Sequence, residues 1–287
     1  MIRISRFIVL SLSSTVVWAA GPVDIDVLYP KGRVLLMKSE QNNVTDAAGM
    51  RIVQVHIQEV EEEVLAQEGD TTHLKMTYKR QAMRTSSPMG SMDFDSARDN
   101  GPIKDPSFAV LGALVGQSFD VLLGQDLSVV EVQGVEGIAQ RIREAMPSDM
   151  PSESVEKVVS SFSSTALAKL VSEKTDVVPD SPVNLGESWT NAVEMQLPGV
   201  GSMITTSVYT LDSVSGDVAT IDFKVSAQMA DGNALLTGLD LSGAGVTHFD
   251  LQAGYFTDSK VEIKMSGEIQ GMPMSVTSTV DVSQTLK

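Results

Sequence analysis

The chain of 287 residues contains no cysteine. This absence excludes disulfides, thiolate metal sites and cysteine nucleophiles. It also excludes a lipid-modified cysteine, so an acyl anchor of the bacterial lipoprotein kind cannot hold the chain on a membrane. An exported protein of this size can build its core without disulfides, and the missing cysteines therefore do not indicate the cytoplasm.

Positive charge is scarce as well. Lys and Arg number 21 against 37 Asp and Glu, which gives a formal net charge of −16. A field of this sign repels phosphate groups, so the composition argues against a nucleic-acid partner and against electrostatic attachment to anionic headgroups. With 42% hydrophobic and 20% charged residues, the chain can still bury a full core.

Histidine is rare and catalytic motifs are missing. The three histidines, His56, His73 and His248, lack the close spacings that zinc sites use. His56 and His73 lie on strands that we expect to pair, where they could face one another. No Gly-Lys-Ser/Thr loop, Gly-x-Ser-x-Gly elbow or dinucleotide fingerprint occurs, so the sequence predicts no cofactor and no catalytic residue.

Residues 1–19 have the pattern of a secretory signal peptide. Arg3 and Arg6 supply the positive end, residues 7–18 form an apolar run, and Ala19 ends a small-residue cleavage pattern. The run is shorter than the about 20 residues that a spanning helix needs. We therefore expect an exported protein of the periplasm or exterior of a bacterium, with no membrane span after signal cleavage.

Residues 20–134 form the predicted N-terminal β-rich half. Apolar and polar side chains alternate there as they do in half-buried antiparallel strands. The alternation changes phase near Glu59, which predicts a bulge. Asp105 and Pro106 are suited to begin a short apolar helix over residues 107–115. The expected strands span residues 33–40, 51–64, 72–84, 92–96, 119–123 and 127–132.

Residues 135–178 form a predicted helical insert, where the chain shows its clearest helical periodicity. Apolar residues recur at helical spacing from Val135 to Met146, and again from Val155 to Leu170. We predict two helices that pack across the concave side of a curved sheet, because long twisted strands need such a cover to bury one face.

Residues 179–287 form the predicted C-terminal β-rich half, in which the glycine-rich stretch from Gly232 to Gly245 reads as a loose connection. The predicted fold class is α+β, with twisted antiparallel sheets in two β-rich halves and a half-open barrel as one arrangement. The strands expected in this half span residues 203–213, 218–229, 245–251, 259–270 and 274–285.

Four segments carry a family resemblance: Phe94-Asp95-Ser96, residues 114–119, residues 129–134 and above all residues 179–189, which read Pro-Asp-Ser-Pro-Val-Asn-Leu-Gly-Glu-Ser-Trp. With these motifs the chain resembles a bacterial family of exported proteins, the domain of unknown function 6263. The likeness covers most of the mature chain, although Gln125-Asp126-Leu127 replaces the usual Asp-Gly turn. The motifs concern turns and packing, so the resemblance implies an exported β-rich protein and no particular activity.

The densest group of potential metal ligands is Asp93, Asp95 and Asp99, whose oxygens suit calcium. An EF-hand loop starting at Asp93 would need ligands where the chain has Ala97 and Lys104. These mismatches favour a solvated turn, and we predict no metal site.

Three side chains are candidates for contact with an apolar ligand: Trp189, Met83 and Phe162. The leading hypothesis is an exported, non-catalytic envelope protein that binds an apolar small molecule or lipid under the helices, or another envelope protein. The alternatives are a hydrolase that works through carboxylates of residues 93–99 and a purely structural protein of the cell surface.

Overall fold

The computed structural model describes residues 21–99, 103, 105–175, 177–197, 201–229, 236–269 and 271–287. The predicted signal peptide, residues 1–19, lies outside the described residues. Strands dominate the structure, and the predicted α+β class is confirmed. None of the helices in the described part of the chain is both long and apolar enough to cross a membrane.

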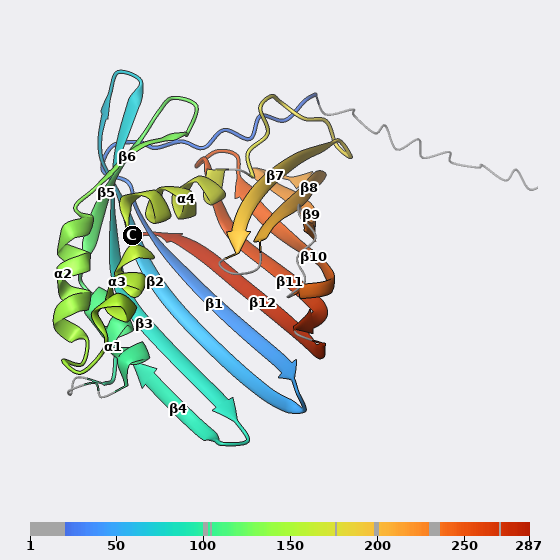
Figure 1. Ribbon diagram of the computed structural model, residues 1–287. Coiled ribbons are helices and arrows are strands. Elements are labelled where there is room, and N and C mark those ends of the chain that lie inside the picture. Colours follow the sequence, from blue (N-terminus) through green and yellow to red (C-terminus); the bar gives the residue numbers. More distant parts are fainter. Residues whose placement is uncertain are drawn as a thin grey trace, which may run out of the picture.

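The strands of the described residues join one antiparallel sheet of twelve strands, in the order β6-β5-β3-β2-β1-β12-β11-β10-β9-β8-β7, with β4 paired to β3 (Figure 1). The sheet is curved and does not close into a barrel. The strands are β1 (Val34–Ala47), β2 (Met50–Glu68), β3 (Thr71–Ser87), β4 (Gly90–Asp95), β5 (Ser118–Leu123), β6 (Val129–Gln133), β7 (Ser188–Leu197), β8 (Gly201–Ser215), β9 (Val218–Met229), β10 (Leu236–Asp250), β11 (Tyr255–Ile269) and β12 (Met272–Leu286).

The two β-rich halves of the chain meet in the middle of this sheet. Strand β1 pairs with β12 from Leu35 opposite Leu286 to Ala47 opposite Met274. The predicted bulge near Glu59 is confirmed, because the register between β2 and β3 shifts between Glu59 and Val60. Strand β10 begins at Leu236, so the part of the glycine-rich stretch that the structure describes is a strand and not a loose connection.

Four helices accompany the sheet: α1 (Pro106–Leu114), α2 (Val135–Ala145), α3 (Ser152–Ser160) and α4 (Ser164–Thr175). The prediction of a single helix from Val155 to Leu170 is wrong. That stretch breaks between α3 and α4, where the Ser163 hydroxyl accepts a hydrogen bond from the Ala166 amide at 3.3 Å. Serine competes for backbone hydrogen bonds in this way and therefore favours helix ends over helix interiors.

One face of the sheet, the inner face, packs against the helices. The buried side chains of β2, β3, β5 and β6 meet those of the helices in a first core, in which Val121, Leu123 and Ile142 are fully buried. Tyr78 belongs to this core, and burial raises its pKa to about 12. The space that the sequence suggested for a ligand, under the helices, is therefore lined by tightly packed apolar side chains.

A second core lies on the inner face of β8, β9 and β10. Leu211, Ile221 and Phe249 are fully buried there, and Phe249 meets Phe256 edge-on at 4.9 Å. The segment that precedes β1 covers this core, because Ile25 is 2% exposed within it. Figure 1 shows this segment crossing one end of the sheet, so helices and N-terminal segment cover the same end.

Candidate ligand-binding face

The strands continue well beyond the helices, and there the inner face has no covering element among the described residues. The register places Ser39 and Gln41 of β1 beside Val282 and Val280 of β12 on this face. We call this uncovered area the open inner face. Its strands are β1, β2, β3, β9, β10, β11 and β12, which are neighbours in the sheet (Figure 1). Strand β4 pairs with β3 at one edge of this area.

The open inner face carries no Lys, Arg, Asp or Glu among its described residues; Glu62 of β2 shares the inner face but lies at the covered end, opposite Leu35 and Met76. Its side chains are half-buried, while the residues between them on the outer face of β11 are exposed and charged, as in Lys260, Glu262 and Lys264. Those outer charges pair with neighbours, for example Lys260 with Asp281 at 3.3 Å. Beyond the covered end, alternation with period two therefore places the Lys, Arg, Asp and Glu side chains of these strands on the outer face.

One part of the open inner face is apolar. The pairing of β9, β10, β11 and β12 brings aliphatic and aromatic side chains together across four strands. Gly245 leaves room for the Phe223 ring, because a Cβ atom at Gly245 would lie 2.5 Å from that ring. We call this area the apolar band; it consists of Phe223, Val225, Val261, Ile263, Met265, Val276, Val280 and Val282.

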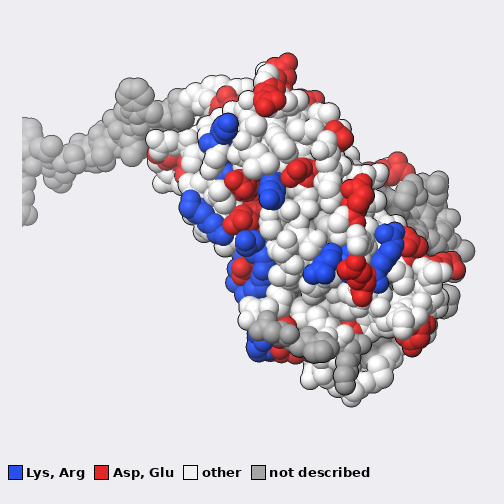
Figure 2. Space-filling model, turned by 90° about the vertical axis from the view of Figure 1, so that its left-hand side faces the viewer, with Lys and Arg blue, Asp and Glu red and all other residues white. Residues whose placement is uncertain are grey.

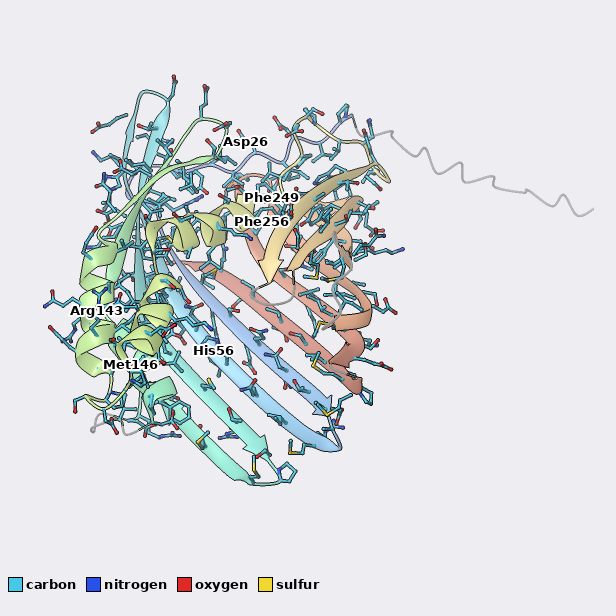
Figure 3. All side chains as sticks on the ribbon, viewed as in Figure 1. Asp26, His56, Arg143, Met146, Phe249 and Phe256 are labelled. Carbon is cyan, nitrogen blue, oxygen red and sulfur yellow. The ribbon has the colours of Figure 1, made fainter. Side chains whose placement is uncertain are left out.

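The other part is polar and contains no Lys, Arg, Asp or Glu. His56 Nε2 lies 3.2 Å from Gln81 Oε1, and Gln41 Nε2 donates to Asn43 Oδ1 at 3.1 Å. Figure 3 shows His56 between the helices and the uncovered end of the sheet. Gln81 is fully buried and its Nε2 has no hydrogen-bond partner in the described structure. This carboxamide band consists of Ser39, Gln41, Asn43, Gln54, His56, Gln58 and Gln81.

The histidines do not form a metal site. His56 lies opposite Met83 in the register, and His73 lies opposite Leu122, so these two do not face one another. His248 is on the outer face, where its Nδ1 lies 2.7 Å from the Asp258 carboxylate. No group of three or more His, Cys, Asp or Glu in the described residues is arranged to hold a metal ion.

The structure does bring Asp93, Asp95 and Asp99 together, but it pairs them with arginines. Arg98 contacts Asp99 at 2.8 Å and Asp93 at 3.0 Å. Asp99 Oδ2 also accepts a hydrogen bond from the Asp95 amide at 2.8 Å. The Arg98 guanidinium therefore pairs with the carboxylates that a metal ion would need as ligands.

Arg80 forms a bidentate pair with Asp95, with Nη2 2.8 Å and Nε 3.0 Å from the two carboxylate oxygens. This pair lowers the pKa of Asp95 to about 2. A general acid needs a raised pKa to hold its proton near neutrality, and this carboxylate is shifted the opposite way.

The three proposed ligand contacts occupy separate places. Trp189 lies in β7, stacks on Tyr209 at 5.7 Å and donates from Nε1 to the Val177 carbonyl at 2.9 Å. Phe162 lies between α3 and α4 and packs against the first core. Met83 lies on the inner face beside the carboxamide band, and the register places Trp189 on the same face in line with Tyr209 and Phe223. Sequence reasoning missed the two bands, although period-two alternation in β11 and β12 was a usable signal.

Trp189 also borders a cleft of about 740 Å³ at the covered end of the sheet. Gln125, Asp126 and Ser128 line its other side, and α4 contributes Ser172. The residues that line the cleft include Asp26 and Asp180, so carboxylates border it. Figure 3 shows Asp26 at the covered end, on the segment that precedes β1.

The helical side of the molecule offers no basic patch. Figure 2 shows acidic and basic side chains intermixed there, separated by wide uncharged areas. Arg143 of α2 illustrates the mixing, because its guanidinium pairs with Glu156 of α3 at 2.7 Å. This side therefore provides no concentrated positive field for a phosphate-bearing partner.

A family model matches residues 69–287 of the chain. The chain belongs to DUF6263, a family of unknown function. The resemblance drawn from the sequence is thereby confirmed. In this DUF6263 member, the segment 179–189 is held by local and long-range hydrogen bonds. Val183 bridges to Val23 by two backbone hydrogen bonds of 2.7 and 2.9 Å, and the Glu187 carboxylate accepts a hydrogen bond from the Asn184 amide at 2.9 Å.

No curated protein matches the chain. Among solved structures, lipovitellin in a study of lipid–protein interactions is similar with a TM-score of 0.49 and 8% identity, and the match covers 91% of this chain but 26% of that one. An outer-membrane channel from Pseudomonas putida F1 gives a TM-score of 0.31 at 8% identity, covering 93% of this chain and 100% of that one. The translocator domain of the autotransporter NalP from Neisseria meningitidis gives 0.30 at 8% identity, covering 90% of each chain. These values are low, and the family match alone carries the assignment.

Proposed function

We propose that this protein is an exported, non-catalytic carrier that binds an uncharged amphiphile along its open inner face. The observation that carries the proposal is the absence of Lys, Arg, Asp and Glu from the described residues of the open inner face, whereas the outer face of the same strands is rich in them. A carboxylate does occur on the inner face at its covered end, where Glu62 lies opposite Leu35 and Met76. A surface meant only for water would not need to exclude such side chains from the inner side of seven neighbouring strands.

The two bands indicate the chemistry of the ligand. An apolar chain laid across Val261, Ile263 and Val280 removes hydrocarbon surface from water, which stabilises by about 25 cal/mol per Å². The carboxamide band offers both donors and acceptors, which suits hydroxyl, ester or amide groups in the head of the ligand. A charged head would find no counter-ion on this face, and its desolvation would oppose binding.

The rival reading, a hydrolase that uses residues 93–99, has less support. Asp93, Asp95 and Asp99 are each held in an ion pair or hydrogen bond with a neighbouring residue. An active carboxylate pair would instead need one member that keeps its proton near neutral pH. A binding role therefore accounts for more of the structure than a catalytic one.

A set of ligands with one chain and different heads tests the proposal. We expect dodecyl maltoside, which is neutral, to bind the mature protein more tightly than dodecanoate or dodecyltrimethylammonium in isothermal titration calorimetry below the micellar concentration. Equal binding of all three would contradict the charge argument, and binding of none would remove the carrier function. Native mass spectrometry with organic extraction of the protein from its own host would identify the natural ligand.

A matched pair of variants locates the site. Val280 of β12 lies on the inner face between Gln41 and Val261, whereas Thr277 of the same strand lies on the outer face. Val280→Glu should weaken dodecyl maltoside binding at least about tenfold, because it places a carboxylate against the ligand chain. Thr277→Glu should leave binding unchanged, and equal losses in both variants would place the ligand elsewhere.

A further inference from the structure

Three hairpin turns at the uncovered end of the sheet expose methionine side chains. They connect β1 to β2, β3 to β4 and β11 to β12, and Figure 1 shows all three at the end of the sheet away from the N-terminal segment. Met89 is 85% exposed, the largest value among the exposed large apolar side chains of the described residues, and Met272 is 50% exposed. We call Met50, Met89, Met92 and Met272 the methionine rim.

Turns at the opposite end of the same sheet have a different composition. Asp70, Asp126, Asp217 and Asp250 stand in or beside the turns that join β2 to β3, β5 to β6, β8 to β9 and β10 to β11. Acidic residues are ordinary in turns, because their side chains accept backbone hydrogen bonds. The exposed methionines of the other end lack such a local role, and they therefore call for a partner.

Charged residues lie beside all three turns of the methionine rim: ion pairs beside the first two, and Glu268 beside the third. Asp46 and Arg51 flank the first turn and lie 3.7 Å apart, and Arg84 lies 3.7 Å from Asp93 beside the second. The rim thus has no excess of Lys or Arg with which to attract an anionic membrane, and the net charge of −16 would repel one. A lipid surface without net charge fits this end of the molecule better than an anionic one.

The rim leads directly into the open inner face. A depression of about 820 Å³ lies beside Met50; Ala47, Met274 and Gly267 line it from the inner face, and Asp46 and Glu268 border it from the outer face. The same three residues lie side by side at the end of β1, β12 and β11 on the inner face. A molecule that leaves a surface touching the rim would therefore reach the open inner face through this depression, whose charged border residues are both acidic.

We propose that the methionine rim docks this protein on the surface of a lipid bilayer whose headgroups carry no net charge. Methionine is flexible and apolar, so exposed methionines can insert between lipid headgroups without a fixed complementary shape. Docking goes beyond the proposed carrier function, because it concerns contact with a bilayer and not binding of a single amphiphile. In this arrangement the open inner face is continuous with the membrane surface.

The test is co-sedimentation of the mature protein with phosphatidylcholine vesicles. We expect the triple variant Met50→Ser, Met89→Ser, Met272→Ser to lower partitioning at least tenfold. The control triple Val130→Ser, Leu170→Ser, Leu185→Ser removes apolar side chains of 62%, 52% and 49% exposure that lie outside the methionine rim. This control should partition as the parent protein does.

Equal loss in both triples would overturn the proposal, as would no partitioning of the parent protein. Stronger binding to vesicles that contain phosphatidylglycerol would overturn the choice of an uncharged surface. Light scattering without vesicles would overturn the proposal if the rim triple converted a stable dimer into a monomer, because the rim would then be covered by a second copy. Binding of dodecyl maltoside to the rim triple reports the carrier function separately, and it should be unchanged.

Discussion

The two ends of the sheet use the same strands in different ways. At the covered end, Leu123, Ile142 and Phe249 are fully buried beneath helices and the N-terminal segment. At the open end, the inner face stays half-buried and the turns carry exposed methionines. Strand length explains the difference: the 19 residues of β2 span about 60 Å, whereas the 11 residues of α2 span about 16 Å. The strands extend beyond their cover.

Truncation of inner-face side chains should give the largest difference in stability loss between the two ends of the sheet. Ile142→Ala at the covered end should lower the free energy of unfolding by about 3–4 kcal/mol, because it leaves a cavity in a closed core. Val280→Ala on the open inner face should lower it by about 1 kcal/mol or less, because solvent already reaches that position. Urea denaturation of both variants measures the difference. Equal losses would mean that the open inner face is packed as a core.

Two glycines with left-handed backbones give the next comparison. Gly254 has a φ of +65°, and a Cβ atom there would lie 2.4 Å from Leu28 Cγ. Gly49 at the open end has a φ of +76° and no atom within 4 Å of that position. Gly49→Ala should cost about 1 kcal/mol for the backbone alone, and Gly254→Ala about 2–4 kcal/mol because it also displaces the N-terminal segment. Urea denaturation measures the losses, which would be equal if the segment were loosely held.

Acidification should give the smallest difference in stability between the two ends of the sheet. Asp95 ends β4, its side chain is 19% exposed, and Arg80 lowers its pKa from 3.8 to about 2. Since the folded pKa is the lower one, the stabilisation is fully present above about pH 4 and is lost as the pH falls through 2. The loss should be about 1 kcal/mol.

Hydrogen exchange can locate this effect. Between pH 4 and pH 2, the amides of β4 should lose protection earlier than those of α2. The Asp95→Asn variant should lack the change, because it cannot titrate. Simultaneous loss of protection in β4 and α2 would contradict a local origin.

Much of the secondary structure could be predicted from the sequence, because alternation and helical spacing are local signals. The bulge at Glu59 and the helices after Val135 and Pro106 are examples that the structure bears out. The stretch from Gly232 to Gly245 was misread for a physical reason. Glycine usually marks a turn, but Gly243 and Gly245 lie within β10, where a Cβ atom at Gly245 would also come 2.4 Å from the Lys260 carbonyl oxygen.

The candidate site was harder to predict. Asp93, Asp95 and Asp99 were recognised as a cluster, but only the fold shows that Arg80 and Arg98 neutralise them. The carboxamide and apolar bands combine residues from β1 to β12, which lie more than 200 positions apart in the chain. No spacing rule connects such residues, because the register of strands decides which of them become neighbours.

By itself the sequence determined the family, the β-rich class, the acidic charge and the alternation that keeps charge off one side of each strand. Those properties depend on composition and on period-two or period-3.6 spacing, which are written along the chain. Only the tertiary structure decided that β1 and β12 join both halves into one curved sheet, and that the helices cover just one end of it. Long-range strand pairing and the limited reach of the helices fix that result, and together they leave part of the inner face open and free of Lys, Arg, Asp and Glu among the described residues.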